Sequence, residues 1–167
     1  MKRSDTDTPP VSVRLATADD AVRLAEFNRA MAMETEAKPL PEDVVSAGVN
    51  AVFSSEDKGF YVVAESDGNV VGALMVTFEW SDWRNGFFWW IQSVYVNPAC
   101  RRRGIYRMLY AYVVDRARAR DDVYGFRLYV ERDNARARKV YQALGMHHTD
   151  YLIYEQSLGV SGAGTEK

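Results

Sequence analysis

The segment with the clearest chemistry is a basic turn that contains a glycine, Arg101-Arg102-Arg103-Gly104. It follows a strand-like run that ends at Val96 and precedes a run with helical spacing of apolar residues. A helix N-terminus presents unpaired N–H groups and the positive end of the helix dipole, so it favours a phosphate. Glycine lets the backbone approach a ligand, and arginines add positive charge. The turn therefore predicts a pyrophosphate-type ligand, with a plain surface turn as the alternative.

Other ligand chemistries are disfavoured. The Gly-Lys-Ser/Thr of a Walker P-loop and the GxGxxG of a dinucleotide turn are both missing, which argues against ATP and NAD. Cys100 is the one cysteine, so no intramolecular disulfide can form. His147 and His148 have no cysteine or third histidine beside them, and we expect no metal site.

Two segments resemble motifs of the GNAT superfamily of N-acetyltransferases. In that superfamily a strand is followed by Arg/Gln-x-x-Gly-x-Gly/Ala and a helix, and Arg101, Gly104 and Tyr106 occupy the three marked positions. Tyr106 departs from the small residue usual there, which affects packing beside the pyrophosphate but leaves the backbone donors intact. The second segment, Asn134–Met146, is similar to N-x-x-A-x-x-x-Y-x-x-x-G-F, with Met for the final Phe. The resemblance extends over nearly the whole ordered chain, about residues 11–155.

The resemblance implies an acetyl-CoA site where the strand ending at Val96 splays from the next strand. It implies that main-chain groups of Val94 and Val96 pair with the pantetheine arm and that residues 101–106 hold the pyrophosphate. Asn134 would lie near the cofactor, although a helix N-cap is an equally good interpretation of this residue. The residues thus assigned to the cofactor are Val94, Tyr95, Val96, Arg101, Arg102, Arg103, Gly104, Ile105, Tyr106 and Asn134.

Tyr141 is the candidate general acid. It lies seven residues after Asn134, two turns along the same helix face. In the superfamily this position offers a phenol to the thiolate leaving group of CoA, which is a reasonable role for a donor near that sulfur. Without the resemblance, Tyr141 would be one of ten tyrosines and would carry no such assignment.

The general base is not identified by either motif. Some superfamily members carry a carboxylate on the strand before the turn, but strand alternation puts Gln92 on the face of Val94 and Val96. Gln92 cannot take a proton; it could position a water or the substrate amine, or satisfy a buried polar position. Glu79, beside Trp80 at the end of the preceding strand, is the nearest carboxylate candidate, with an exposed strand-end acid as the alternative.

Two further groups of residues point to the acceptor. Glu34 and Glu36 lie between two predicted helices, a region that shapes the acceptor site in the superfamily, although a solvated helix end is the alternative. The four tryptophans fall within eleven residues and could form core, a dimer surface or a ligand wall. An aromatic wall with nearby acids suits an amine with some apolar body. The predicted substrate residues are Glu34, Glu36, Trp80 and Gln92.

The elements that must position these side chains follow from the apolar spacing. Strands are predicted at about residues 11–15, 59–65, 70–80, 87–96, 125–130 and 149–155. Helices are predicted at about residues 17–33, 41–53, 104–120 and 134–144. This order predicts an α/β (α+β) fold with a mixed, largely antiparallel central sheet and helices on both faces. The helix at 104–120 should be the crossover between two parallel strands.

Length and composition favour one soluble domain. The chain has 167 residues, 47% apolar and 26% charged. Residues 1–10 and 157–167 are polar and predict loose tails around an acetyltransferase domain at 11–156. No run reaches the roughly 18 apolar residues of a membrane span, and no signal peptide is evident, so we expect a cytoplasmic protein without a membrane partner.

The charge balance bears on partners. A net charge of -2 gives no general attraction to nucleic acid. Residues 1–100 hold 8 basic and 15 acidic side chains, whereas residues 101–140 hold 12 and 5. The basic block suits an anionic ligand and the acidic part mildly favours a cationic one, unless these charges merely form solvated faces.

Taken with the resemblance, these observations predict an acetyl-CoA-dependent N-acetyltransferase, which transfers acetyl to a primary amine by direct attack in a ternary complex. The acceptor is open among small polyamine-like amines, amino acid or antibiotic amines, and protein N-termini or lysines; a homodimer is also open. The rival function is a non-catalytic acyl-CoA-binding module, for which the amide at Gln92 is the best argument.

Overall fold

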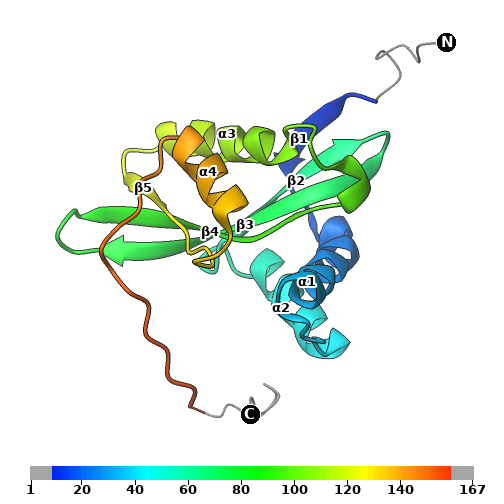
Figure 1. Cartoon of the computed structure of the whole chain (residues 1–167), viewed down its shortest axis with the longest axis horizontal. Coiled ribbons are helices and arrows are strands. Elements are labelled where there is room, and N and C mark those ends of the chain that lie inside the picture. Colours follow the sequence, from blue (N-terminus) through cyan, green and yellow to red (C-terminus); the bar gives the residue numbers. More distant parts are fainter. Residues whose placement is uncertain (1–8, 159–167) are drawn as a thin grey trace. The chain divides into compact units, whose positions relative to one another are not determined.

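The computed structural model describes residues 9–158, which fall into two compact units, residues 9–128 and 129–158. Short 3₁₀ turns lie at Ala18–Asp20 and Pro98–Cys100. Figure 1 labels the longer elements of the first unit, which are β1 (Val11–Leu15), α1 (Ala21–Glu36), α2 (Glu42–Phe53), β2 (Phe60–Ser66), β3 (Asn69–Ser81), β4 (Gly86–Val96), α3 (Ile105–Arg118) and β5 (Val123–Arg127). The second unit contains α4 (Ala135–Ala143).

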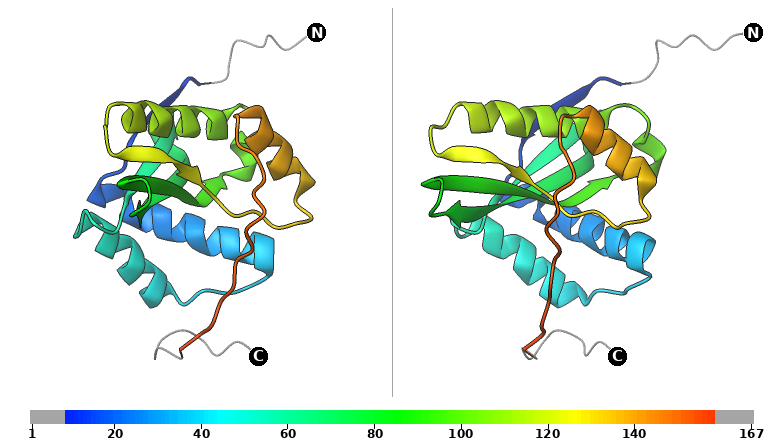
Figure 2. Two further views of the ribbon diagram at one scale, coloured as in Figure 1. Left: turned by 90° about the vertical axis from the view of Figure 1, so that its left-hand side faces the viewer. Right: turned by 60° about the vertical axis from the view of Figure 1, so that its left-hand side comes forward.

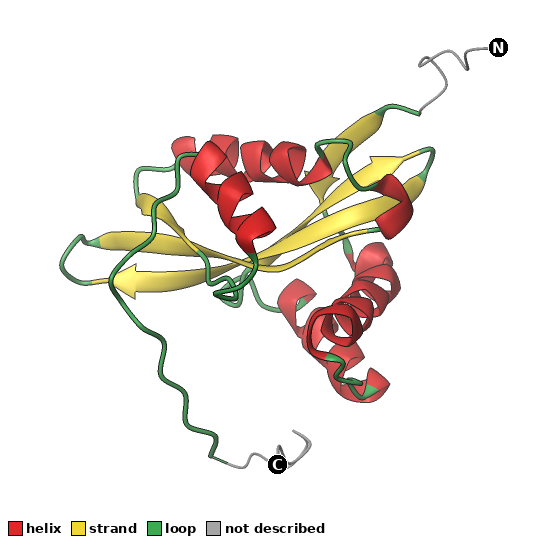
Figure 3. Ribbon diagram, viewed as in Figure 1, coloured by secondary structure: helices red, strands yellow, loops and turns green. Residues whose placement is uncertain are grey.

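The first unit is built on one five-stranded sheet. Its strands follow the order β1-β2-β3-β4-β5, and every pair is antiparallel except β4 with β5, which is parallel (Figure 3). The largely antiparallel sheet and the parallel crossover through α3 are therefore confirmed. So is the fold class, a mixed and largely antiparallel sheet with helices.

Helices cover both faces of this sheet (Figure 2). On one face, α1 and α2 bury a cluster that includes Leu24, Phe27 and Val49 against Tyr61 and Val63 of β2. On the other face, α3 contributes the fully buried Leu109 and Val113. The apolar periodicity of these helices predicts both contacts, since each buries one stripe and leaves its charged positions in water.

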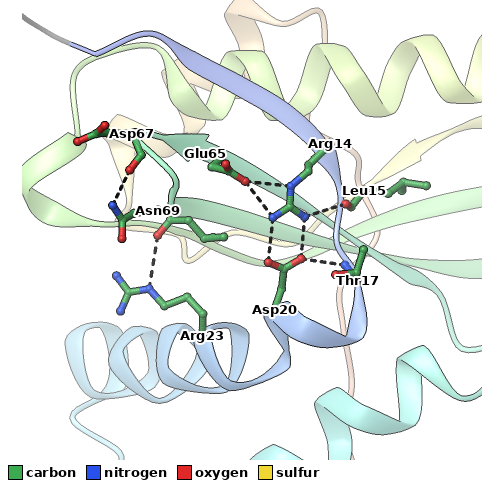
Figure 4. A network of polar contacts seen from close by, with 9 residues as sticks. Arg14, Leu15, Thr17, Asp20, Arg23, Glu65, Asp67 and Asn69 are labelled. Carbon is green, nitrogen blue, oxygen red and sulfur yellow. Dashed lines mark hydrogen bonds and ion pairs between the residues drawn. The ribbon is translucent and has the colours of Figure 1, made fainter.

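The start of α1 is fixed by a buried carboxylate (Figure 4). Asp20 is 7% exposed and accepts hydrogen bonds from both terminal nitrogens of Arg14, at 2.7 and 3.0 Å, and from the Thr17 N–H at 2.8 Å. Arg14 also donates from Nε to Glu65 at 3.0 Å. The hydrogen bonds from Arg14 hold the pKa of Asp20 below its usual range. This network ties β1, β2 and the first helical turn together, as the Thr17/Asp20 pattern predicts for a helix start.

Two predictions about strands need correction. β5 spans Val123–Arg127 and not 125–130. The strand predicted at 149–155 is wrong, because residues 151–158 carry no secondary structure and Tyr151, Leu152, Ile153 and Tyr154 are exposed. Side-chain types report β-propensity, but a strand also needs a neighbouring backbone to pair with, and a single sequence does not say where that neighbour is. Among residues 9–158, no helix is long and apolar enough to cross a membrane.

Candidate active site

The turn between β4 and α3 has a backbone that suits an anion. Arg102 and Gly104 both have left-handed backbones, with φ of 67° and 73°, and Gly104 directly precedes the first residue of α3. A Cβ built on Gly104 would meet no protein atom within 4 Å. The space on the Cβ side of Gly104 is therefore open within the described residues, directly before the first N–H groups of α3, which suits a pyrophosphate site. The adjoining residues Ile105 and Tyr106 form the first turn of α3.

The three arginines of the turn do different things. Arg101 donates from Nε to the Val96 carbonyl at 2.9 Å and from its two terminal nitrogens to Glu34 at 2.6 and 2.8 Å. Arg103 donates to the Pro9 carbonyl at 2.6 Å, while Arg102 is exposed. The side chain of Arg101 thus braces the turn against the end of β4 and the C-terminal part of α1, and the exposed Arg102 lies free of that brace.

Glu34 lies against the turn, where it pairs with Arg101. The sequence predicted only that Glu34 is an acid near the acceptor. Its pairing with Arg101 lowers the pKa of the Glu34 carboxyl. Glu36, two residues on, is exposed at the end of α1, where Ala37 takes a left-handed backbone with φ 52°. The two acids are therefore not equivalent: Glu34 links α1 to the turn, and Glu36 faces solvent.

A β-bulge in β4 corrects the strand alternation expected from the sequence. Gln92 lies opposite Met75 and Tyr95 opposite Ala73, with a register shift between these pairs, and Ser93 has a positive φ of 49°. One extra residue inverts the alternation beyond it. Gln92 consequently shares a face with Tyr95. The prediction that Gln92 shares a face with Val94 and Val96 is therefore wrong.

The faces of these residues are fixed by their neighbours. The Tyr95 ring lies 4.9 Å from the ring of Phe27 of α1, centroid to centroid. Val96 lies on the face of α3, because a Cβ on Gly72 would touch both Val96 and Ile105. The Val96 side chain therefore packs on the α3 face of the sheet.

The last residues of β4 do not pair with β5. Pairing of β4 with β5 begins at Phe87 and ends with Trp90 opposite Arg127. The remaining residues of β4, 91–96, have no partner in β5. Main-chain groups along such an edge can pair with an extended ligand, as strands do in β-augmentation. This edge leads directly into the turn at residues 101–104.

The face of the sheet that α1 and α2 cover continues as a polar row. Glu79 of β3 accepts hydrogen bonds from Arg127 of β5, at 2.5 Å, and from the indole N–H of Trp90. The guanidinium of Arg127 also lies 3.8 Å above the centroid of the Phe88 ring. Glu79 and Arg127 are both partly exposed, at 38% and 35%. Glu79 is therefore a positioned carboxylate between three strands, and no solitary strand-end acid.

Gln92 lies in the same row. Its side-chain amide donates to the Thr77 hydroxyl. Thr77 is paired with Trp90 across β3 and β4, which connects Gln92 to the group around Glu79. Sequence reasoning missed Arg127 and Thr77. A charged residue inside the strand predicted at 125–130 was the available signal for Arg127, but its partner could not be identified without the sheet register.

The tryptophans serve different purposes. Trp89 is 3% exposed and packs in the core, where its ring contacts Phe60 and Phe78. Trp80 packs edge-on against Phe87 on the α3 face of the sheet, and it is 53% exposed. Glu79 lies on the other face of the sheet. Trp83 in the hairpin turn is 86% exposed. Of the four tryptophans, only Trp90 donates a hydrogen bond to Glu79, which lies opposite Phe88 in the sheet. Trp80, which the sequence order suggested as the neighbour of that acid, lies on the other face.

The second unit carries the other motif. The Asn134 side chain accepts from the Ala137 N–H at 3.0 Å, so it caps α4. Tyr141 lies in the last turns of α4, and burial raises the pKa of its phenol. The phenol is therefore protonated at neutral pH and able to donate. Gly145 has a φ of 87°, the left-handed backbone that is typical of glycine after a helix end. His147 and His148 are exposed, and no group of residues within 9–158 has the His, Cys, Asp or Glu composition to hold a metal ion.

Comparisons with known proteins show similarity to acetyltransferases. Residues 25–146 match the sequence model of the acetyltransferase (GNAT) family. A possible acetyltransferase from Clostridium difficile 630 is 43% identical, with a TM-score of 0.83 over 89% of this chain and 97% of the other. No curated protein matches the sequence.

Two more distant structures share the fold and contain the cofactor. A predicted acetyltransferase from Clostridium acetobutylicum, solved with acetyl-CoA, is 17% identical with a TM-score of 0.74, over 91% of this chain and 99% of the other. An aminoglycoside N-acetyltransferase in complex with CoA is 18% identical with a TM-score of 0.72, over 92% of this chain and 98% of the other.

Proposed function

Because the chain belongs to the GNAT family of acetyltransferases, we propose that it transfers the acetyl group of acetyl-CoA to a primary amine by direct attack in a ternary complex. The observation that carries this proposal is the open helix N-terminus at Gly104, continuous with the unpaired end of β4. Together they offer N–H donors to a pyrophosphate and a strand edge to the pantetheine arm.

The residues of the turn and of the end of β4 would contribute to cofactor binding in different ways. The backbone of residues 102–106 would hold the pyrophosphate, with Arg102 adding charge from the exposed side. Val94 to Val96 would pair with the pantetheine through main-chain groups. Arg101, which is bonded to Val96 and Glu34, would keep the turn in shape before the cofactor arrives, so less conformational entropy is lost on binding.

The acceptor would approach over the polar row. Glu79 has one donor on each oxygen, and its remaining lone pairs can accept from an ammonium group. We assign Glu79 to orienting the amine, and Gln92, fixed by Thr77, to positioning the same amine or a water that removes its proton. Glu36, which is exposed, would place negative charge at the C-terminal end of α1 and favour a cationic acceptor, whereas the charge of Glu34 is balanced by Arg101.

Tyr141 would complete the reaction. Nitrogen attacks the carbonyl carbon of the thioester, the C–S bond breaks, and the sulfur leaves as a thiolate. The Tyr141 phenol, whose pKa burial raises further above neutral, can donate its proton to that sulfur as charge develops. The proton that the amine loses to water would restore the phenol through solvent. Asn134 would serve this step indirectly, by capping the helix that carries Tyr141.

Turnover separates this function from its rival, a non-catalytic acyl-CoA-binding module. The purified chain would be mixed with acetyl-CoA and a panel of polyamines, amino acids, aminoglycosides and peptides with free N-termini, and thiol release would be followed. The proposal expects release that depends on one class of amine. Tight acetyl-CoA binding with no amine-dependent release across the panel would favour the binding module.

A further inference from the structure

Arg127 is a charged side chain of the polar row that has no role in the steps described so far. It lies on β5, opposite Trp90 of β4. Its Nη1 donates to Glu79 at 2.5 Å, and within residues 9–128 this is the one hydrogen bond that the guanidinium makes. A guanidinium has five N–H donors, so most of them remain for another acceptor. Because the side chain is 35% exposed, a ligand over the row can reach it.

Acceptors for an ammonium group lie close to the same tryptophan. Glu79 accepts one hydrogen bond on each oxygen, from Arg127 and from the indole N–H of Trp90, and keeps lone pairs on both. Gln92 donates from its amide nitrogen to the hydroxyl of Thr77, which lies opposite Trp90 on β3. That bond uses the nitrogen, so the amide oxygen of Gln92 remains an acceptor. The row therefore offers acceptors towards β3 and a cationic donor on β5.

The charges of this group favour one class of acceptor. Glu79 and Arg127 balance each other, so the pair exerts little net attraction on a polycation, and a second ammonium group near the guanidinium would be repelled. A zwitterion satisfies both members at once, because a guanidinium binds a carboxylate with two parallel hydrogen bonds. In an α-amino acid the two charged groups share one carbon, and adjacent strands are only about 4.8 Å apart, so one small molecule can span the pair.

We propose that the acceptor is a free α-amino acid, whose ammonium group lies against Glu79 and Gln92 and whose carboxylate is bound by Arg127. This inference rests on the proposed acetyl transfer and adds the class of acceptor to it. A peptide N-terminus has a neutral amide in place of the carboxylate, so it cannot satisfy Arg127 in this way.

The transfer to such an acceptor is balanced. Acetyl-CoA and the amino acid give the N-acetyl amino acid, CoA and one proton. Nitrogen forms its bond to the acetyl carbon as the C–S bond breaks, and the ammonium group loses two protons in all, one of which is matched by the proton that the sulfur gains while the other remains in solvent. The product keeps its carboxylate but has lost the positive charge that faces Glu79, which favours its release.

The first test changes the acceptor and leaves the protein as it is. Each protein amino acid would be offered with acetyl-CoA beside its methyl ester and its decarboxylated amine, and thiol release would be followed. At least one amino acid should exceed its own ester and amine about 10- to 100-fold in kcat/KM, the factor expected for a hydrogen bond between charged groups. Release with esters or amines that equals or exceeds release with every amino acid would overturn the inference and leave the proposed transfer standing.

A binding measurement separates the two proposals when no thiol is released. Calorimetry on the chain saturated with CoA, which carries no acetyl group to transfer, would use the same sets of amino acid, ester and amine. Selective binding of an amino acid without turnover would support recognition of the zwitterion and count against the transfer. Binding of no amino acid more tightly than its ester and amine would overturn the inference.

The last test changes Arg127. Arg127→Met keeps an unbranched stem over the Phe88 ring and removes the charge, so the ratio of kcat/KM for the amino acid to that for its decarboxylated amine should fall about 10- to 100-fold. Arg127→Lys keeps the charge without the paired donors and should give an intermediate ratio.

Arg84→Met is the matched control. The guanidinium of Arg84 also lies over the Phe88 ring, 5.2 Å from its centroid, but Arg84 is exposed in the turn between β3 and β4, outside the row. Its variant should keep a ratio near that of the wild type. An unchanged ratio in a folded Arg127→Met variant, or an equal fall in both variants, would contradict the assignment of Arg127 to the carboxylate.

Discussion

Replacement of Gly104 by valine should separate cofactor binding from folding. Gly104 has a φ of 73°, and a side chain there would meet no protein atom within 4 Å. A residue other than glycine pays about 1–2 kcal/mol in this left-handed region. For a chain of this size, that lowers Tm by roughly 2–8 °C. The variant should therefore fold, and the added methyl groups should obstruct only a ligand.

The expected loss of binding follows from the donors that a pyrophosphate would lose. One hydrogen bond to a charged group contributes about 1.5–3 kcal/mol, so displacement of a single N–H contact should raise the Kd for acetyl-CoA about 10- to 100-fold. Isothermal titration calorimetry on the folded variant measures this directly.

Gly68→Val is the matched control. Gly68 has a φ of 69°, a Cβ there would also meet no protein atom within 4 Å, and it lies in the turn between β2 and β3. It should lose similar stability and keep its affinity for acetyl-CoA. The reasoning is refuted if the variant at Gly104 binds as the wild type does, or if both variants lose affinity equally.

Three further outcomes are expected. Tyr141→Phe keeps the ring and should bind acetyl-CoA normally while kcat falls roughly 10²- to 10⁴-fold; a wild-type kcat where chemistry limits the rate would remove Tyr141 from the mechanism. Glu79→Gln should lower kcat/KM for the amine and leave the Kd for acetyl-CoA unchanged, whereas equal losses in both would indicate misfolding. Asp20→Asn should cost about 2–3 kcal/mol of unfolding free energy, because it weakens charged hydrogen bonds to Arg14. The pKa of Asp20 is depressed in the folded chain, so its stabilisation is present at neutral pH and is lost as pH falls below the ordinary aspartate pKa of about 4 and through the depressed value. Urea titrations of the variant should therefore show a flatter acid limb below about pH 4. An acid limb as steep as that of the wild type would contradict this.

Local signals in the sequence predicted most of the fold. Thr17 and Asp20 mark a helix start, Gly145 a helix end, and Gly68 a hairpin turn, and each has the backbone that its type favours. These features depend on residues a few positions apart, so a single sequence contains the whole interaction. The turn at Gly104 belongs to the same class.

The parts that the sequence did not predict depend on partners far along the chain. The bulge at Ser93 changes which residues share a face of the sheet with Gln92. A serine at this position does not by itself indicate a bulge. The pairing of Glu79 with Arg127 requires the register of three strands across 48 residues. The strand expected at 149–155 has the right composition, yet its partner strand is not a property of that segment.

The account depends most on where the cofactor binds, and a crystal structure of the chain with acetyl-CoA and a bound amine tests that directly. The pyrophosphate should contact the backbone of residues 102–106, the pantetheine should run along β4 beyond Trp90, and the amine should lie over the row that contains Glu79 and Gln92. Density for the pyrophosphate away from the N-terminus of α3, in a crystal where the cofactor is fully occupied, would contradict the account.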